Sequence, residues 1–211
     1  MEALRKAERH QRRLPARREI IREDEPIRER RALLSGWACR QRILSDGRRQ
    51  ILGFLLPGDL IGMCQHSNPL ASTTIVTVNE VVMYPAPVAE PAGGLSEAYF
   101  RSAALEEHYL LAHITRLGQF SAYERLVDWL LETEERLAFA GLSTADQVPL
   151  PLTQEMLADA LGLTSVHVNR TLQAIRRDGL LTLRGGMMSL PDRARLEKLV
   201  DHKPARVSSD C

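Results

Sequence analysis

The sequence predicts an α+β fold with a strand-rich N-terminal region, one long amphipathic helix and a compact C-terminal region of short helices and a β-hairpin. Three observations predict it. Short apolar runs separated by turn signals occupy residues 36–84. A proline-rich break at residues 85–94 ends them, and the apolar residues beyond it recur at helical spacing. Two short capped helices then follow within residues 152–177. Such a change of periodicity is typical of a strand region followed by a helical one.

The composition sets limits on the class of protein. The 211 residues are 44% hydrophobic and 26% charged, which provides enough apolar material for cores and excludes a wholly disordered chain. No run of residues is long and apolar enough for a membrane helix, and the charged start lacks a secretory signal. Three scattered cysteines, Cys39, Cys64 and Cys211, do not make a disulfide framework. We therefore expect a cytoplasmic protein, and the formal net charge of +1 by itself favours no nucleic-acid partner.

The first 84 residues divide into a charged segment and a segment of short apolar runs. Residues 1–35 contain eleven Lys/Arg and seven Asp/Glu, a mixture that favours a solvated or frayed segment over a basic DNA-binding arm. Further on, Asp46-Gly47 is a hairpin signal and Pro57-Gly58 suits a type II turn. Apolar runs lie around these turns, at residues 51–56, 73–78 and 81–84. Short runs at this spacing predict an all-β roll or barrel.

A long helix is expected from Ser96, a suitable N-cap, to about Gly118, roughly 33 Å in length. Its heptad positions carry one acid, Glu107, among apolar residues, and these apolar residues are the predicted dimer contacts: Phe100, Ala103, Leu110, Ile114 and Leu117. Such a stripe can form a seam with the same helix of a second copy, or it can lie on the chain's own β-region. A second amphipathic helix is expected at about residues 121–140.

The segment from Leu152 to Arg177 has the layout of a helix-turn-helix. Thr153 can cap a short helix, Gly162 lies where that helix must stop, and Thr164 can cap a second helix. Helix, tight turn and helix within about 25 residues is the spacing of this motif.

The second of these helices has two contrasting faces. Val168, Leu172 and Ile175 form an apolar stripe, whereas the opposite face has no acidic residue. On that face, Arg170 can bind guanine, Asn169 and Gln173 can pair with adenine, and Val166 can contact a thymine methyl group. The sequence therefore predicts a DNA-reading helix. The predicted contacts in and around it are Thr153, Thr164, Ser165, Val166, His167, Asn169, Arg170 and Gln173.

Residues 181–190 predict a hairpin closed by Gly185-Gly186. In that register Leu183 opposes Met188 and Thr182 opposes Ser189, so apolar and polar pairs alternate as in a half-buried ribbon. A helix-turn-helix followed by such a ribbon is a winged helix. Arg184, near the tip of the wing, is expected to bind phosphate.

This order of parts resembles the CRP/FNR family of bacterial transcription regulators. The resemblance is carried by SGWACRQRILSDGRRQILGFLLPGDLIGM (35–63), SAYERLVDWLLE (121–132) and LTQEMLADALGLTSVHVNRTLQAIRRDGLL (152–181). It implies a β-roll sensor like the cyclic-nucleotide-binding jelly roll at 1–89, a linker and dimerisation helix at 90–120, a winged helix at 121–192 and a C-terminal tail at 193–211. It also implies a homodimer on a palindromic DNA site, an effector signal in the roll, and RNA polymerase as a further partner.

The resemblance places the base-reading residues at Ser165, Val166, Asn169 and Arg170, although family members often have a glutamate where this chain has Val166. The roll departs from the cyclic-nucleotide-binding members, which have a Gly-Glu pair where this chain has Gly62-Met63. No arginine lies between residues 49 and 101, so a cyclic phosphate would lack its charge partner. An effector other than cAMP or cGMP is therefore expected.

Other chemistries have less support in the sequence. Iron–sulfur members of the family use four cysteines and this chain has three; no residue argues for haem or a metal, so no cofactor is expected. Asp46 and Asp59 have no paired acid, and no Walker loop or nucleophile elbow is present, which argues against an enzyme. Cys39 and Cys64 are either small buried residues or a redox switch. The near-neutral region 143–211 also permits a ligand-sensing module whose winged helix contacts protein.

Overall fold

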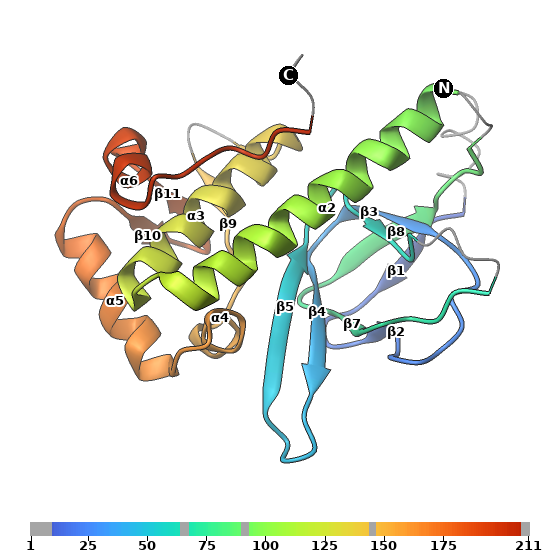
Figure 1. Cartoon of the computed structure of the whole chain (residues 1–211), viewed down its shortest axis with the longest axis horizontal. Coiled ribbons are helices and arrows are strands. Elements are labelled where there is room, and N and C mark those ends of the chain that lie inside the picture. The colour runs from blue at the N-terminus through green and yellow to red at the C-terminus, as the bar shows by residue number, and fades with distance from the viewer. Residues whose placement is uncertain (1–9, 64–67, 90–92, 144–146, 208–211) are drawn as a thin grey trace. The chain divides into compact units, whose positions relative to one another are not determined.

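The computed structural model describes residues 10–63, 68–89, 93–143 and 147–207 (Figure 1). The chain forms two compact units, residues 1–47, 52–110 and 206–211 in the first and residues 48–51 and 111–205 in the second. The strands of the first unit are β1 (Arg12–Leu14), β2 (Glu19–Ile21), β3 (Arg31–Ser35), β4 (Ala38–Ile43), β5 (Arg49–Leu55, which starts in the second unit), β6 (Leu60–Ile61), β7 (Thr74–Thr77) and β8 (Val81–Pro85).

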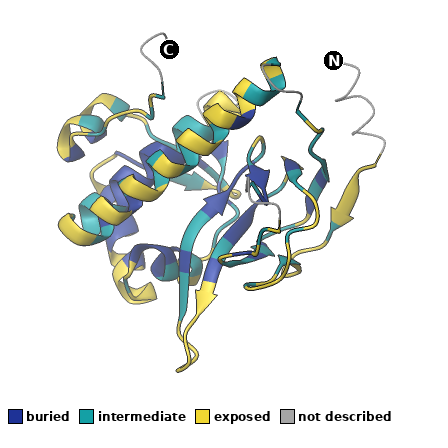
Figure 2. Cartoon of the chain, turned by 45° about the vertical axis from the view of Figure 1, so that its right-hand side comes forward, coloured by how far each residue is buried: buried dark blue, intermediate teal, exposed yellow. Residues whose placement is uncertain are grey.

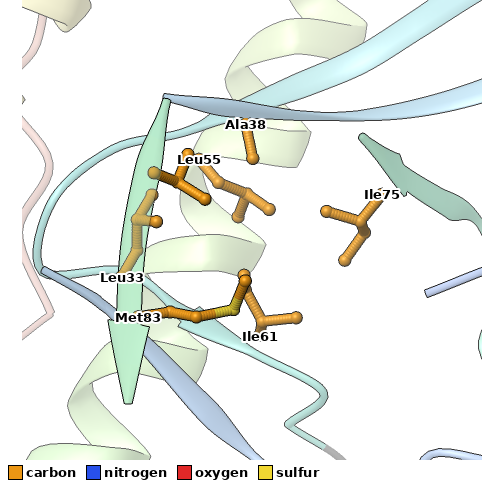
Figure 3. Close-up of a cluster of buried hydrophobic side chains, with 7 residues drawn as sticks. Leu33, Ala38, Leu55, Ile61, Ile75 and Met83 are labelled. Carbon is orange, nitrogen blue, oxygen red and sulfur yellow. The ribbon is translucent and has the colours of Figure 1, made fainter. Parts of the chain in front are cut away.

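These strands form two four-stranded sheets, in the orders β1-β8-β3-β6 and β2-β7-β4-β5. Neighbouring strands pair antiparallel, for example with Arg40 opposite Ile75 and Leu33 opposite Met83. Side chains from both sheets meet in one apolar core (Figure 3), which contains Leu33, Ala38, Leu55, Ile61, Ile75, Val81 and Met83. The expected β-roll is therefore confirmed, with its core enclosed by the two sheets.

Both turn signals lie where the sequence placed them. The Asp46-Gly47 pair lies in the turn that joins the neighbouring strands β4 and β5, and the tip of this hairpin is exposed (Figure 2). At Pro57-Gly58, the backbone N–H of Asp59 donates to the carbonyl oxygen of Leu56 at 2.9 Å, which closes a four-residue turn.

The expectation of a solvated segment at residues 1–35 is wrong for its described part, because β1, β2 and β3 all lie there. Leu14, Ile20 and Ile21 pack against the core of the roll, while the neighbouring charged side chains face solvent. Some of these charges form ion pairs, as Arg13 of β1 does with Glu80, which directly precedes β8, at 2.6 Å. The charged residues thus lie on the solvent-facing sides of these strands and in the segments between them, and their number obscured the short apolar alternation.

The long helix, α2 (Gly94–Gln119), begins two residues before Ser96 and continues through Gly118. Near its start, Tyr99 packs against Ala32 and Leu60 of the roll, and its hydroxyl group donates to the carbonyl oxygen of Pro87 at 2.6 Å. Much of the rest of the helix surface is exposed (Figure 2).

The second unit contains α3 (Ala122–Phe139), β9 (Val148–Pro149), α4 (Gln154–Leu161), α5 (Ser165–Arg177), β10 (Thr182–Arg184), β11 (Met187–Ser189) and α6 (Arg193–Val200). Helix α3 begins with a capping box between Ser121 and Glu124, and it packs against α4, α5 and α6. The segment expected as a tail thus includes a helix, α6, whose Leu196 and Val200 are buried.

A buried group of charged and polar side chains lies where the last turns of α2 meet α3. We call it the Arg116 cluster, and it consists of His113, Arg116, Asp128, Glu132 and His202. Arg116 is 2% exposed; its Nε atom donates to Asp128 at 2.8 Å and its Nη2 atom donates to Glu132 at 2.6 Å. The Nδ1 atom of His202, which follows α6, lies 2.8 Å from the other oxygen of Asp128. The cluster therefore ties α2, α3 and the C-terminal segment together.

The pKa values of the two histidines in the cluster are shifted in opposite directions. Burial, together with the nearby guanidinium of Arg116, lowers the pKa of His113 to about 4. Burial also opposes protonation of His202, but hydrogen bonds to Asp128 and Glu135 outweigh it and raise its pKa to about 9. At neutral pH, His202 is therefore cationic and His113 is neutral.

Candidate nucleic-acid interface

The helix-turn-helix is built by two threonine caps and one glycine. The Thr153 hydroxyl accepts from the backbone N–H of Met156, and the Thr164 hydroxyl accepts from that of His167, both at 3.2 Å. Gly162 ends α4 with a φ of 63°, in the left-handed region that favours glycine. These three positions are the ones that the sequence predicted, and they fix the angle at which α5 leaves α4.

The inner face of α5 anchors it to the unit. Val168 and Ile175 have no exposed surface, and Leu172 is also buried. At the end of the helix, the hydroxyl of Tyr123 on α3 donates to the carboxylate of Asp178 at 2.8 Å. Burial and this carboxylate raise the pKa of Tyr123 to about 12, so the hydroxyl keeps its proton. The predicted apolar stripe is thus confirmed, and α5 is held along its length.

The outer face of α5 is exposed along its length and carries no acidic residue. The residues on it are Ser165, Val166, His167, Asn169, Arg170, Gln173, Arg176 and Arg177. Within the described parts of the chain, no acidic side chain forms an ion pair with Arg170, Arg176 or Arg177. These cations and amides are therefore available to a partner outside the chain.

One residue near this face was not predicted. Gln154, the first residue of α4, is exposed, and its Nε2 atom donates to Asn169 Oδ1 at 3.3 Å. The sequence could have drawn attention to Gln154 only through its neighbour Thr153, which was predicted to contact DNA.

The wing has the predicted register. Thr182 opposes Ser189, Leu183 opposes Met188, and Arg184 opposes Met187 beside the Gly185-Gly186 turn. β11 also pairs with β9, which gives a three-stranded sheet in the order β10-β11-β9. Both glycines have positive φ, as a tight two-residue hairpin turn requires. Arg184 is exposed at the tip.

The predicted seam residues of α2 differ in exposure. Phe100 and Ile114 are 60% and 66% exposed, and Ala103 and Leu110 are exposed too. Leu117 is partly buried, and its Cδ2 atom lies 3.5 Å from the position that a Cβ atom would take on Gly162. Leu111, which the heptad pattern did not include, is 58% exposed.

Cys39 is buried in β4, which fits a small core residue, whereas Cys64 lies outside the described residues. Among the described residues, no group of three or more His, Cys, Asp or Glu side chains could hold a metal ion. No helix in the described ranges combines the length and the apolar character that crossing a membrane requires.

Comparisons with known proteins agree with this geometry. Family models match residues 11–90 as a cyclic nucleotide-binding domain and residues 124–199 as a Crp-like helix-turn-helix domain. The nitrogen fixation regulation protein FixK of Bradyrhizobium diazoefficiens is 37% identical over 172 residues, which cover 79% of this chain and 72% of that protein. The transcriptional activatory protein AadR of Rhodopseudomonas palustris is 30% identical over 78% of this chain and 70% of its own length. The solved structure of FixK2 from Bradyrhizobium japonicum superposes with a TM-score of 0.78 at 29% identity, over 93% of this chain and 98% of that one.

Proposed function

Because the chain belongs to the CRP/FNR family of transcription regulators, we propose that it binds a palindromic DNA site as a homodimer and reads the sequence with α5. The chain is a transcription regulator with a helix-turn-helix DNA-binding domain, and its relatives are regulators rather than enzymes. The proposal includes the dimer, the residues that bind DNA and the nature of the effector. It also includes a cytoplasmic location and contact with RNA polymerase.

One observation carries the proposal: the outer face of α5 is exposed, free of acids and without ion-pair partners among the described residues. Arg170 can donate two hydrogen bonds to guanine O6 and N7, and Val166 can contact a thymine methyl group. Asn169 and Gln173 can contact adenine. Thr153, Thr164, Ser165 and His167 surround these groups at the helix starts, where backbone and hydroxyl donors suit phosphate. Arg184 on the wing would bind phosphate without reading sequence.

The exposed apolar side chains of α2 support the homodimer. Phe100, Leu110, Leu111 and Ile114 lie on a helix that runs into the DNA-binding unit, with Ala103 between them. An unpaired apolar stripe of this kind is stabilised by the same stripe on a second copy. A two-fold axis along α2 would present two α5 helices to half-sites about one DNA turn, near 34 Å, apart.

We propose that the roll takes an effector other than a cyclic nucleotide. Met63 stands where the cyclic-nucleotide-binding members have a glutamate, and its side chain packs with Ala32, Leu60 and Tyr99. Neither Lys nor Arg occurs from residue 50 to residue 100, so a buried phosphate would have no cation from this stretch. Titration calorimetry with cAMP and cGMP should give no binding heat and no change in DNA affinity.

A gel shift with random-sequence DNA at two salt concentrations tests the central proposal against a winged helix that contacts protein instead. A DNA-binding protein releases counterions, so its affinity should fall steeply between about 50 and 200 mM salt. Sedimentation should show a dimer for the wild type and a monomer for Ile114→Asp, with weaker DNA binding by the variant. Absence of binding at low salt, or a flat salt dependence, would favour the protein–protein alternative.

A further inference from the structure

Gln154 meets Asn169 because both backbones are fixed by the helix-turn-helix. Gln154 directly follows the Thr153 cap, and Asn169 lies five residues after the Thr164 cap. Buried residues on the inner faces of α4 and α5 hold the two helices against each other. The 3.3 Å hydrogen bond between the two exposed carboxamides therefore depends on the packing of the motif.

Among the described side chains near Asn169, Gln154 is the one that hydrogen-bonds to its carboxamide. Val166 precedes Asn169 by one helical turn on the same face, and its side chain has no polar atom. Among the residues that the structure describes, Gln154 is the only side chain that hydrogen-bonds to Asn169.

This bond restricts what Asn169 offers to a base. A carboxamide has two acceptor positions on its oxygen and two N–H donors on its nitrogen. Gln154 occupies one acceptor position and turns the carbonyl group toward α4, while both N–H donors of Asn169 stay free. In the major groove guanine, adenine and thymine present acceptors, whereas cytosine presents only the N4 amino donor.

We propose that Gln154 is a positioning residue for sequence recognition: it holds the Asn169 carboxamide so that the amino group faces the base and selects against cytosine. The inference rests on the proposed function, since it requires α5 to lie in the major groove. It adds to that function a residue of α4 that sets specificity without itself reading a base.

Selection of bound sequences from a random DNA pool tests the proposal with the full-length protein. Asn169→Ala identifies the base pair that Asn169 reads in each half-site. The wild type should bind its selected site about tenfold more tightly than a site with cytosine at that position, in line with the usual cost of one mismatch. Gln154→Ala frees the carboxamide to rotate, so this preference should fall to about twofold, since part of the contact energy is lost.

Gln154→Glu is the sharper variant. A carboxylate can only accept, so it would bind the amino group of Asn169 and turn the carbonyl oxygen outward. The preference should then shift to a base with an exposed amino donor, adenine or cytosine. Gln173→Glu is the matched control, because it adds the same charge to the same surface and has no bond to Asn169. It should change preference at another base pair and leave the exclusion of cytosine intact, while random-DNA affinity falls similarly in both variants.

The outcomes separate the inference from the function on which it rests. If the wild type selects a symmetric site but both Gln154 variants keep its preference at every position, the inference is overturned and the function stands. A wild type that prefers cytosine at the Asn169 position would also overturn it, because the amide would then present its oxygen. If the wild type selects no sequence at all, the proposed function fails as well.

Discussion

Two arginines of the second unit lie in opposite environments. Arg116 is 2% exposed and is hydrogen-bonded to Asp128 and Glu132, whereas Arg170 is exposed and has no acidic partner among the described residues. A buried guanidinium must be paired because removing a charge from water is costly, but an exposed one can stay unpaired at little cost. The chain therefore supplies the partners of Arg116, which fixes the structure, and leaves Arg170 for a partner that is not part of the chain.

The largest effect should come from breaking the buried pair. Arg116→Met keeps an apolar stem but removes the guanidinium that hydrogen-bonds to both buried carboxylates, so that Asp128 keeps His202 and Glu132 keeps Arg136 as a cationic neighbour. Because two buried charge-assisted hydrogen bonds are lost, we expect a loss of about 3 kcal/mol in the free energy of unfolding. Urea unfolding of the full chain measures it. Arg177→Met removes an exposed arginine instead and should change stability by less than about 0.5 kcal/mol. Equal stabilities of the two variants would remove the contrast between the buried and exposed arginines.

The next effect is a dependence of stability on pH. The pKa of His202 is raised to about 9, so its contribution is fully present below pH 6.5 and is lost as the pH rises from 6.5 through 9, a change of about 3 kcal/mol. The pKa of His113 is lowered to about 4, so its contribution is present above pH 6.5 and is lost as the pH falls through 4.

Unfolding measured across this range should therefore show greatest stability near pH 6.5. His202→Gln should flatten the decline on the alkaline side and leave the contribution of His113 on the acid side in place. A wild type whose stability rises between pH 6.5 and 9 would contradict the assigned role of His202.

A smaller effect, on DNA affinity, is expected from the exposed arginine Arg170. Arg170→Ala should weaken binding to the selected site by about 1–3 kcal/mol and relax the preference at one base pair per half-site. Fluorescence anisotropy with selected and random DNA measures both, and the free energy of unfolding should stay within about 0.5 kcal/mol of the wild type. A large loss of stability would mean that Arg170 has a structural role like that of Arg116.

The smallest effect should come from the wing. Arg184→Ala should weaken binding to selected and random DNA by about the same factor, below about 1 kcal/mol, and lower the slope of affinity against salt by about one. If the loss were confined to the selected sequence, Arg184 would be reading bases and the division of roles between α5 and the wing would need revision.

The same contrast explains what the sequence could predict. The caps at Thr153 and Thr164, the end of α4 at Gly162 and the register of the wing depend on neighbours a few residues away. An exposed face that lacks acids is equally visible, because helical periodicity alone separates it from the apolar stripe.

Long-range partners were not predictable in this way. Arg116 pairs with residues 12 and 16 positions away, and His202 reaches Asp128 across 74 positions. The contact between Gln154 and Asn169 depends on the packing of two helices. The strands of the charged segment before residue 35 pair with β7 and β8, which lie about 50 residues or more further along the chain. The residues exposed for a partner were thus easier to predict than those that pair inside the fold.

Hydroxyl-radical footprinting on the selected DNA site shows how many α5 helices engage the duplex and how far apart they lie. For a homodimer we expect two equivalent protected patches, related by a two-fold axis, with centres about one helical turn apart. A single patch, or two patches without that symmetry, would contradict a homodimer that reads two half-sites with α5.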